Sequence, residues 1–345
     1  MLKIHKNIEI VSSTEVGLSS MSELSRETAR VALARHYTSV VVTIINTPAD
    51  LEALVLRKPD LVFLGMKYLP ANPHLGRNDP DKIWIAEYLD KHDILYTGSG
   101  HQAHESELNK EQAKRHVANA GLKTSIFKLI ERGAIPDIED TDLTYPLFVK
   151  PANRGGGQGI DDKSLVSNFE ELCAKVESIS TVLAADSLVE KYLPGREFSV
   201  AILKDGFDAD YHVMPLELVS DDGVLSAAVK ESNSEVVTLV AEFDTHDQLR
   251  DLALGVFEAL GARDYGRVDI RMDEHGVPHF LEANLLPSLI DDYGSFPKAC
   301  ALSLEIDHEH MLIAIAGLAF ARVFSSEEET AEYELTMPSA IPLPG

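Results

Sequence analysis

The hydrophobic positions of residues 1–100 alternate between a period typical of β-strands and a period typical of amphipathic helices. Continuous or β-branched apolar runs predict strands at 8–13, 39–45, 60–66 and 94–100, the last of which ends in a glycine turn. Helical spacing of the apolar residues predicts helices at 22–37, 49–58 and 80–93. This alternation indicates an open parallel sheet with helices on its faces, and such sheets bind ligands at the carboxyl ends of their strands.

Beyond residue 100 the pattern predicts a mixture of helices and strands in a less regular order. Helices are expected at 105–121, 167–179, 247–262 and 306–324. Strands are expected at 144–150, 187–193 and 198–203, and a β-hairpin at 267–284. Residues 216–240 are polar and irregular, so we expect a loop with little core there. The acidic, proline-bearing stretch from Ser325 onward is expected to be mobile.

The length and the charge narrow the range of partners. A chain of 345 residues is too long for one small core, so two or three subdomains are expected. With 31 basic and 56 acidic residues, its formal net charge of −25 repels nucleic acids and anionic lipids. A polyanionic ligand would therefore need a local basic pocket and a divalent cation.

The remaining composition indicates a cytoplasmic protein without a membrane partner. The N-terminus lacks the features of a signal peptide, and the longest apolar run is too short to span a bilayer. The two cysteines, Cys173 and Cys300, lack zinc-site spacing and are expected to be buried small hydrophobes.

The stretch RVDIRMDEHGVPHFLEAN, residues 267–284, predicts a hairpin around the turn DEHG. In it Asp269 lies opposite Glu282 and Arg267 lies opposite Asn284, and all four side chains share one face. The residues predicted on the opposite, apolar face are Ile270, Met272 and Leu281. Two acids directly across a strand pair repel each other unless a cation lies between them, and oxygen ligands suit Mg²⁺. A solvated charged face is the alternative, and a one-residue bulge would break the register.

Three further features could bind a nucleotide, although each also has a simpler interpretation. The glycine-rich segment 149–159 allows backbone N–H groups to approach phosphates beside Lys150, or it is a flexible surface loop. Segment 189–197, VEKYLPGRE, looks like a strand that stops at Pro-Gly. A base could pair with its backbone, and Glu190 and Glu197 could accept ribose hydroxyls or hold a basic partner. Otherwise it is an ordinary strand end. Lys110 begins a helix and is either a phosphate contact or a surface lysine.

The order of these features resembles the ATP-grasp superfamily, and most closely its D-alanine–D-alanine ligase family. The segments that carry the resemblance are YTGSG, the Lys110 helix, VKP with its glycine loop, EKYLPGREF and RVDIRM…HFLEANLLP. It covers residues 90–322 well and the first ninety residues poorly. It implies an α/β fold, α+β in the ATP-binding part. The implied units are an N-terminal Rossmann-like substrate domain at 1–100, ATP-grasp subdomains at 101–188 and 189–324, and a tail at 325–345.

The resemblance also implies roles for individual residues. The implied nucleotide contacts are Lys110 and Lys150 for the phosphates, Glu190, Lys191 and Leu193 for adenine, and Glu197 for the ribose. The implied magnesium ligands, which would also suit Mn²⁺, are Asp269, Glu282 and Asn284. The implied catalytic set is Arg267, which stabilises a tetrahedral intermediate, Lys230 of a lid loop, and Gly156 and Gly157 of the closing glycine loop.

The amino-acid pocket departs from the family pattern. Gly156 and Gly157 stand where the family has serines, and Glu231 follows the lid lysine where the family has a tyrosine. Ser288 and Tyr293 replace a glycine and a serine. The expected substrate contacts are Glu15, which is otherwise a helix-terminal acid, Glu231 and Ser288.

We therefore expect an ATP- and magnesium-dependent carboxylate–amine ligase that joins amino acids through an acylphosphate. Its substrates are either two D-alanines or other amino acids. The alternatives are a kinase and a nucleotide-binding regulator on the same fold. A homodimer is expected from the resemblance alone.

Overall fold

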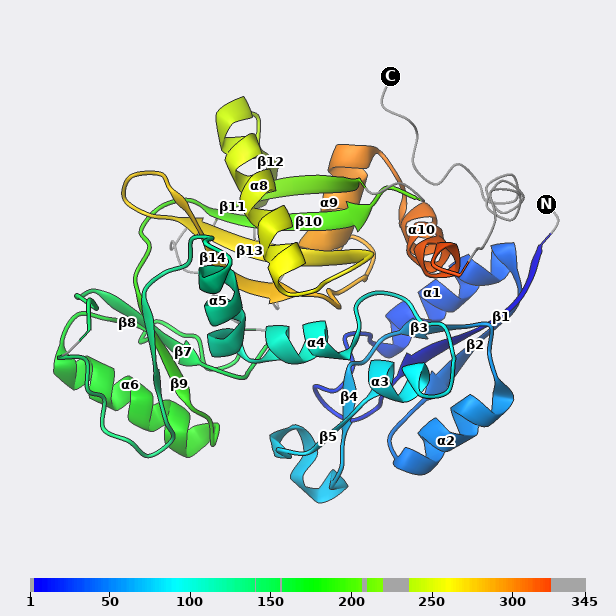
Figure 1. The fold of residues 1–345 in the computed structure, drawn as a ribbon, viewed down its shortest axis with the longest axis horizontal. Helices are drawn as coiled ribbons and strands as arrows, with labels where there is room; N and C mark the ends of the chain where they lie inside the picture. The colour runs from blue at the N-terminus through cyan, green and yellow to red at the C-terminus, as the bar shows by residue number, and fades with distance from the viewer. Residues whose placement is uncertain (1–2, 140, 156, 207–209, 220–235, 324–345) are drawn as a thin grey trace.

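In the computed structural model, the N-terminal part of the chain is built on a parallel sheet (Figure 1). The structure describes residues 3–139, 141–155, 157–206, 210–219 and 236–323. The sheet has the order β2-β1-β3, with β1 at Ile4–Ser12, β2 at Tyr37–Ile44 and β3 at Leu61–Leu64. Its parallel pairing confirms the predicted open sheet.

The two crossover helices of this sheet begin at well-defined caps. Helix α1, Glu23–His36, starts after Ser22, whose side chain accepts the N–H of Ser25. Helix α2, Pro48–Arg57, starts with a capping box between Thr47 and Asp50 and has proline in its first turn. Both helices lie where the apolar spacing predicts them.

Residues 68–100 differ from the prediction. The expected helix at 80–93 is wrong in its first part, because β5 (Lys82–Trp84) pairs antiparallel with β4 (Tyr68–Pro70). Only α3, Ile85–Asp90, is helical, and a 3-10 helix, Pro73–Asn78, lies between the two strands. The expected strand at 94–100 is reduced to one parallel bridge between Tyr96 and Val62.

The middle part has an antiparallel sheet and a core of its own. Its strands, in the order β6-β9-β7-β8, are Phe127–Ile130, Ser187–Lys191, Leu147–Pro151 and Leu165–Val166. Helix α6, Phe169–Val182, packs against this sheet. The helix predicted at 105–121 is two helices, α4 (His101–Leu108) and α5 (Lys110–Asn119). The break lies at Asn109, whose side chain accepts the N–H of Gln112 and caps α5.

The third part is a five-stranded antiparallel sheet of order β12-β11-β10-β13-β14. Its strands, in chain order, are β10 Glu197–Lys204, β11 Tyr211–Val219, β12 Val236–Leu239, β13 Tyr265–Met272 and β14 Pro278–Asn284. The loop expected at 216–240 is therefore wrong at both ends, because Leu216–Val219 pairs with Val236–Leu239. Residues 220–235 lie outside the described residues.

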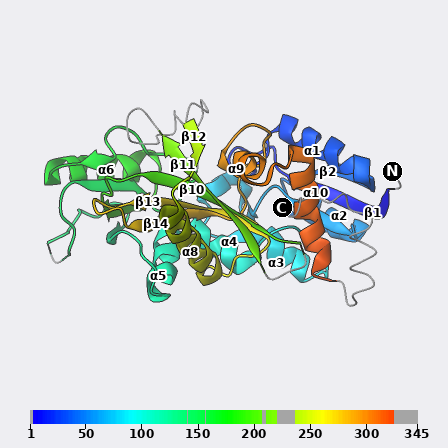
Figure 2. The same ribbon diagram turned by 90° about the horizontal axis from the view of Figure 1, so that it is seen from above.

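Three helices complete this part, α8 (Phe243–Ala259), α9 (Ser295–Leu304) and α10 (His308–Ala321). Helix α10 packs against α1 and β3 of the first sheet, as Figures 1 and 2 show. The chain thus returns to the N-terminal part after crossing the other two sheets.

The hairpin β13–β14 has the predicted pairs, Arg267 with Asn284 and Asp269 with Glu282. The register shifts by one residue after Asp269, so that Ile270 pairs with Phe280. This β-bulge lets Phe280 enter the core while Glu282, two residues later, faces the same side as Asp269. The placement of Leu281 on the apolar core face is wrong, because the bulge turns it toward a cavity beside Glu282.

Two simpler expectations can be checked directly. Cys300 is buried as predicted, whereas Cys173 on α6 is only partly buried. Among the helices of the described ranges, none combines the length and apolar character needed to cross a membrane.

Candidate active site

Two cavities meet at the polar face of hairpin β13–β14. The larger has a volume of about 280 Å³ and the smaller about 70 Å³, and Asp269 and Glu282 line both. The smaller cavity lies between the hairpin and the end of β9, and the larger lies between the hairpin, α4 and the start of α5. One strand pair therefore supplies a shared wall.

The smaller cavity brings together most of the residues predicted to contact a nucleotide. Those residues are Lys150, Glu190, Lys191, Leu193 and Glu197. Phe148, Ile160 and Leu281 add apolar surface to the same cavity. The mixture of apolar walls and a few polar groups is typical of a small-molecule site.

Glu190 is held between two lysines at the base of this cavity. Its carboxylate lies 2.7 Å from Lys114 Nζ and 2.8 Å from Lys150 Nζ, and all three side chains are buried. Burial alone would raise the pKa of Glu190, but the two ammonium groups outweigh it and lower that pKa. From the sequence, Glu190 is expected either to accept ribose hydroxyls or to hold a basic partner, and in the structure it pairs with two lysines.

Lys114 is a part of this cluster that sequence reasoning missed. Its Nζ also donates to Thr124 Oγ1 at 2.8 Å and Ser125 Oγ at 3.0 Å. Burial, helped by the charge of Lys150, lowers the pKa of Lys114 to about 8. A lysine in a polar helix looks like a surface residue, and only the packing of α5 against Phe280 and the middle sheet buries it.

Glu197 and Lys191 have partners at the mouth of the smaller cavity. Glu197 Oε2 accepts a hydrogen bond from Arg271 Nη1 at 2.8 Å, and Arg271 Nη2 donates to the Tyr192 hydroxyl at 3.2 Å. Lys191 Nζ lies 3.4 Å from Glu274 Oε1 in the hairpin turn. These contacts tie the segment after β9 to the hairpin.

In the larger cavity each hairpin acid has a cation beside it. Arg267 forms a bidentate pair with Asp269, at 2.9 and 3.0 Å, and Ser199 Oγ donates to Asp269 Oδ1 at 3.1 Å. Lys110 Nζ lies 3.4 Å from Glu282 Oε2 and donates to Arg154 O at 2.5 Å. Burial lowers the pKa of Lys110, although Glu282 opposes this effect. The cations Arg267 and Lys110 therefore already offset the repulsion between the two acids.

The predicted metal ligands Asp269, Glu282 and Asn284 all line the larger cavity. Within the described ranges, no group of three or more His, Cys, Asp or Glu side chains is placed to hold a metal ion, and this set reaches three only through Asn284. Two carboxylates, an amide oxygen and phosphate oxygens of a substrate still form a donor set that suits Mg²⁺.

The predicted substrate and loop residues are divided between the cavity and other places. Ser288 lines the larger cavity, where its buried Oγ has no hydrogen-bond partner among the described residues. Glu15 is exposed in a turn after β1 and lines neither cavity. Gly157 is buried, with a φ of 73°, but lines neither cavity. Gly156, Lys230 and Glu231 lie outside the described residues.

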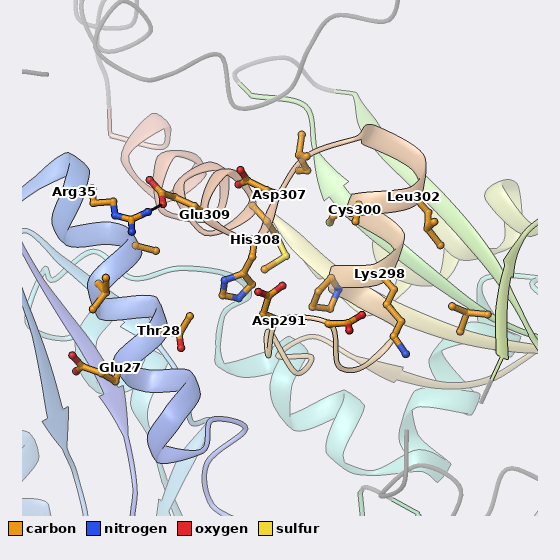
Figure 3. A pocket seen from close by; sticks show the side chains of 18 residues that line it. Glu27, Thr28, Arg35, Asp291, Lys298, Cys300, Leu302, Asp307, His308 and Glu309 are labelled. Carbon is orange, nitrogen blue, oxygen red and sulfur yellow. Dashed lines mark hydrogen bonds and ion pairs between the residues drawn. The ribbon is translucent and has the colours of Figure 1, made fainter. Parts of the chain in front are cut away.

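A still larger cavity, of about 860 Å³, lies between α1 and helices α9 and α10 (Figure 3). Arg35 of α1 pairs with Glu309 of α10 on its wall, and Asp291, Lys298 and His308 also line it. It contains none of the residues predicted for the site. The hairpin is the candidate active site because charge-paired lysines, oxygen donors and a cation converge there.

The comparisons with known proteins point in one direction. Residues 117–309 match the family described as D-ala D-ala ligase C-terminus. A D-alanine–D-alanine ligase of Geobacter sulfurreducens is 30% identical over 278 residues, which cover 79% of this chain and 82% of that protein. One of Nitrosococcus oceani is 29% identical over 251 residues, covering 72% and 75% of the two chains.

A similar fold is found in the crystal structure of a D-alanine–D-alanine ligase from Bacillus anthracis complexed with ATP. The TM-score is 0.69 at 19% identity, and the match covers 92% of this chain and 99% of the other. A match of that extent must include most of residues 1–90, where the sequence resemblance is weak. It shows the fold of the described residues that it covers, which include most of the parallel sheet at the start of the chain.

Proposed function

The chain belongs to the D-alanine–D-alanine ligase family, and from this premise we propose how its two joined cavities serve an ATP-dependent ligase. The observation that carries the proposal is the polar face of hairpin β13–β14. It presents the carboxylates of Asp269 and Glu282 to both cavities, and Arg267 to the larger one. Such a wall can hold a nucleotide's phosphates at the boundary between a base-binding and a substrate-binding space.

The smaller cavity receives the adenosine part of ATP. Leu193, Phe148 and Leu281 offer apolar contact to the base, and Lys191 and Glu197 lie at its mouth. Lys150 and Lys110 reach the phosphates, with Lys150 oriented by Glu190 and Lys110 by Glu282. These roles agree with the predicted ones, except that the Glu190 side chain positions lysines instead of facing the base.

Asp269, Glu282 and Asn284 would hold Mg²⁺, or Mn²⁺ in its place. When bound, the ion neutralises charge on the β- and γ-phosphates. Arg267 pairs with Asp269 and Lys110 lies beside Glu282, so both cations would stand next to the phosphate oxygens that these acids and the ion hold.

The chemistry needs no covalent bond to the protein. A substrate carboxylate oxygen attacks the γ-phosphorus of ATP, the bond to the β-phosphate oxygen breaks, and an acylphosphate and ADP form. An amine then attacks the acyl carbon, its proton is lost, and phosphate leaves as the amide forms. Arg267 stabilises the negative charge on the carbonyl oxygen in the tetrahedral intermediate, because a fixed cation in a buried site is effective there. Burial of the site also limits hydrolysis of the acylphosphate.

The altered amino-acid pocket leaves two substrate assignments, two D-alanines or other amino acids. Ser288 and Tyr293 at the cavity wall favour other amino acids. A nucleotide-binding regulator is disfavoured by the complete set of Arg267, Asp269, Glu282 and Asn284 at one cavity, whereas a kinase would need the same groups and stays the alternative. A homodimeric state, a cytoplasmic location and the domain boundaries at 100, 188 and 324 stay predictions.

The deciding experiment measures phosphate release from ATP and Mg²⁺ with D- and L-amino acids offered singly and in pairs, with products identified by mass spectrometry. A dipeptide supports the ligase. A stable phosphorylated product would support the kinase, and tight ATP binding without phosphate release from any pair would support the regulator.

A variant of the metal site tests the residue assignments. We expect Glu282→Gln to lower turnover by at least 100-fold, because an anionic oxygen donor to the ion is lost. The variant should still fold and lose only a small part of its thermal stability, because the new group has the same shape although the buried Lys110 loses its carboxylate partner. Glu258→Gln on α8 is a suitable control. Wild-type rates in Glu282→Gln would refute the metal assignment.

A further inference from the structure

The larger cavity contains an ion pair that the proposed mechanism does not use. Lys67, just beyond β3, lies with its Nζ 2.5 Å from Oε1 of Glu107 in the last turn of α4. Both residues line the cavity together with Lys110, Arg267 and Glu282. The Lys67 side chain is 21% exposed to solvent, whereas the Glu107 side chain is 1% exposed.

Glu107 is fixed from three sides. In addition to Lys67, it accepts a hydrogen bond from Nδ1 of His104 at 2.9 Å and one from the backbone N–H of Leu285. Burial would raise the pKa of Glu107, but Lys67 and His104 outweigh burial and lower it, while burial lowers the pKa of His104. At neutral pH the group thus consists of an ionised Glu107, a neutral His104 and the cation Lys67. The Glu107 side chain is too buried for an ammonium group of a substrate to reach it.

Lys67 is the member of this group that can touch a substrate. An ammonium group has three donors, and Glu107 takes only one of them. The loop position is also fixed, because the carbonyl of Lys67 accepts the N–H of Ile85 at 3.0 Å. Lys67 lines the same cavity as Lys110, Arg267 and Glu282, the groups proposed to contact the phosphates and the reacting carbonyl, so it lies in the space where the phosphate acceptor must bind.

We propose that Lys67, held by Glu107, determines the substrate class by binding a second carboxylate of the acid that is phosphorylated. This inference rests on the proposed function and names its acyl substrate as a dicarboxylic amino acid. The reacting carboxylate must turn toward the γ-phosphate, so it cannot also remain on Lys67. An α-amino acid with one carboxylate would then leave the remaining donors of Lys67 without a carboxylate of the substrate.

Hydroxylamine as the amine isolates the first substrate, because it converts any acylphosphate into a hydroxamate without the natural amine. We would measure hydroxamate formation with the aspartates and glutamates of both hands, with their side-chain amides asparagine and glutamine, and with alanine. We expect the wild-type enzyme to prefer the dicarboxylic substrate by at least tenfold in kcat/KM.

Variants of Lys67 test its contribution. Lys67→Gln should raise KM for the dicarboxylic substrate by about 10- to 100-fold, with a smaller change in kcat, because a charge-assisted hydrogen bond is lost. The KM of the matching amide should change less than threefold. Lys67→Arg keeps the charge and should recover part of the preference.

Since Lys67→Gln leaves Glu107 buried without its cation, the double variant Lys67→Gln/Glu107→Gln serves as the folding control. It removes both charges, and it should melt near the wild type while still lacking the dicarboxylic preference. The inference is overturned if the wild type uses alanine or the amides as well as the dicarboxylic acids, or better. It is also overturned if Lys67→Gln changes KM equally for the acid and its amide. Neither result would contradict the proposed ligase activity. No hydroxamate from any acid by an enzyme that binds ATP would instead refute the proposed ligase.

Discussion

Glu190 lies between Lys114 and Lys150, and these three buried side chains carry one more positive than negative charge. This excess buried positive charge is unfavourable for folding, and it lies where a polyphosphate is proposed to bind. Its effect is seen at Lys114, whose pKa is lowered from 10.5 to about 8. Lys150 moves in the other direction, because Glu190 and Glu282 outweigh burial and raise its pKa.

The lowered pKa of Lys114 predicts how stability depends on pH. Between pH 8 and 10.5 the unfolded chain binds this proton more tightly than the folded protein, so the free energy of unfolding rises with pH across that window. Lys114→Met removes this contribution. We expect the free energy of unfolding of wild type relative to Lys114→Met to increase by about 1–2 kcal/mol from pH 7 to pH 9.5. Urea unfolding at both pH values measures it.

The exposed Lys163 provides the matched control for this prediction. Lys163→Met should follow the wild-type pH dependence. A difference between wild type and Lys114→Met that stays constant or falls as pH rises would contradict the assignment of a lowered pKa to Lys114.

At the scale of elements, local sequence patterns predicted the hairpin but not its bulge. The turn DEHG and the alternating side chains of 267–284 are local signals, and the pairs of Arg267 and Asp269 followed from them. The bulge at Leu281 is set by the core, which needs Phe280 on the inner face beside Ile270. That demand is not visible in the hairpin's own sequence.

The other differences between the predicted and observed elements also arise from contacts that are distant in the sequence. The apolar spacing around Lys82–Trp84 also fits a helix. These residues form a strand because they pair with Tyr68–Pro70, which lies outside that local pattern. Leu216–Val219 looks like part of a polar loop until it pairs between β10 and β12. Likewise Lys67, Glu107 and Lys114 are ordinary charged residues in the sequence, and only the fold brings them into the site.

The contact between the hairpin and the segment after β9 depends on a glycine. The N–H of Gly195 donates to Met272 O at 2.9 Å, and a Cβ there would lie 2.7 Å from Met272 O and 2.8 Å from Asp273 O. Because both atoms belong to the backbone, Gly195→Ala should lower the free energy of unfolding by about 2–3 kcal/mol. It should also weaken ATP binding, since Leu193 and Glu197 flank it at the smaller cavity. Urea unfolding and calorimetric titration measure the two effects.

Gly155 is the control for stability, because a Cβ at that position meets nothing within 4 Å. Gly155→Ala should change the free energy of unfolding by less than about 1 kcal/mol. Equal losses of stability in the two variants would show that the close approach at Gly195 has no special importance.

At the scale of the whole molecule, the three sheets are not independent. The core around the first sheet includes α9 and α10 as well as Ala201, Leu203 and Tyr265 of the third sheet. Residues 96–100 contact both parts, because Tyr96 bridges to Val62 of β3 and the N–H of Gly98 donates to Asp264 just before β13. They lead directly into α4, which carries Glu107. The position of the proposed substrate lysine Lys67 relative to the hairpin therefore depends on this junction.

Arg322, just after α10, closes the junction. It pairs with Asp264, which also accepts the N–H of Gly98 at 3.0 Å, and it donates to the carbonyl of Tyr96. Arg322→Met leaves a buried carboxylate without its cation, so we expect the free energy of unfolding to fall by about 3 kcal/mol. Hydrogen exchange should rise in α10 and in residues 94–100 before it rises in the middle sheet, whose core is separate.

Arg250 on α8 pairs with Asp247 and Asp251 at the surface, so Arg250→Met should cost less than about 1 kcal/mol. The double variant Asp264→Asn/Arg322→Met should recover part of the lost stability, because no unpaired charge remains buried. If Arg322→Met instead exchanged hydrogen uniformly over all three sheets, or cost no more than Arg250→Met, then Arg322 would not be what couples α10 to the entrance of α4. The arrangement of the site would in that case depend on the apolar core between the first and third sheets alone.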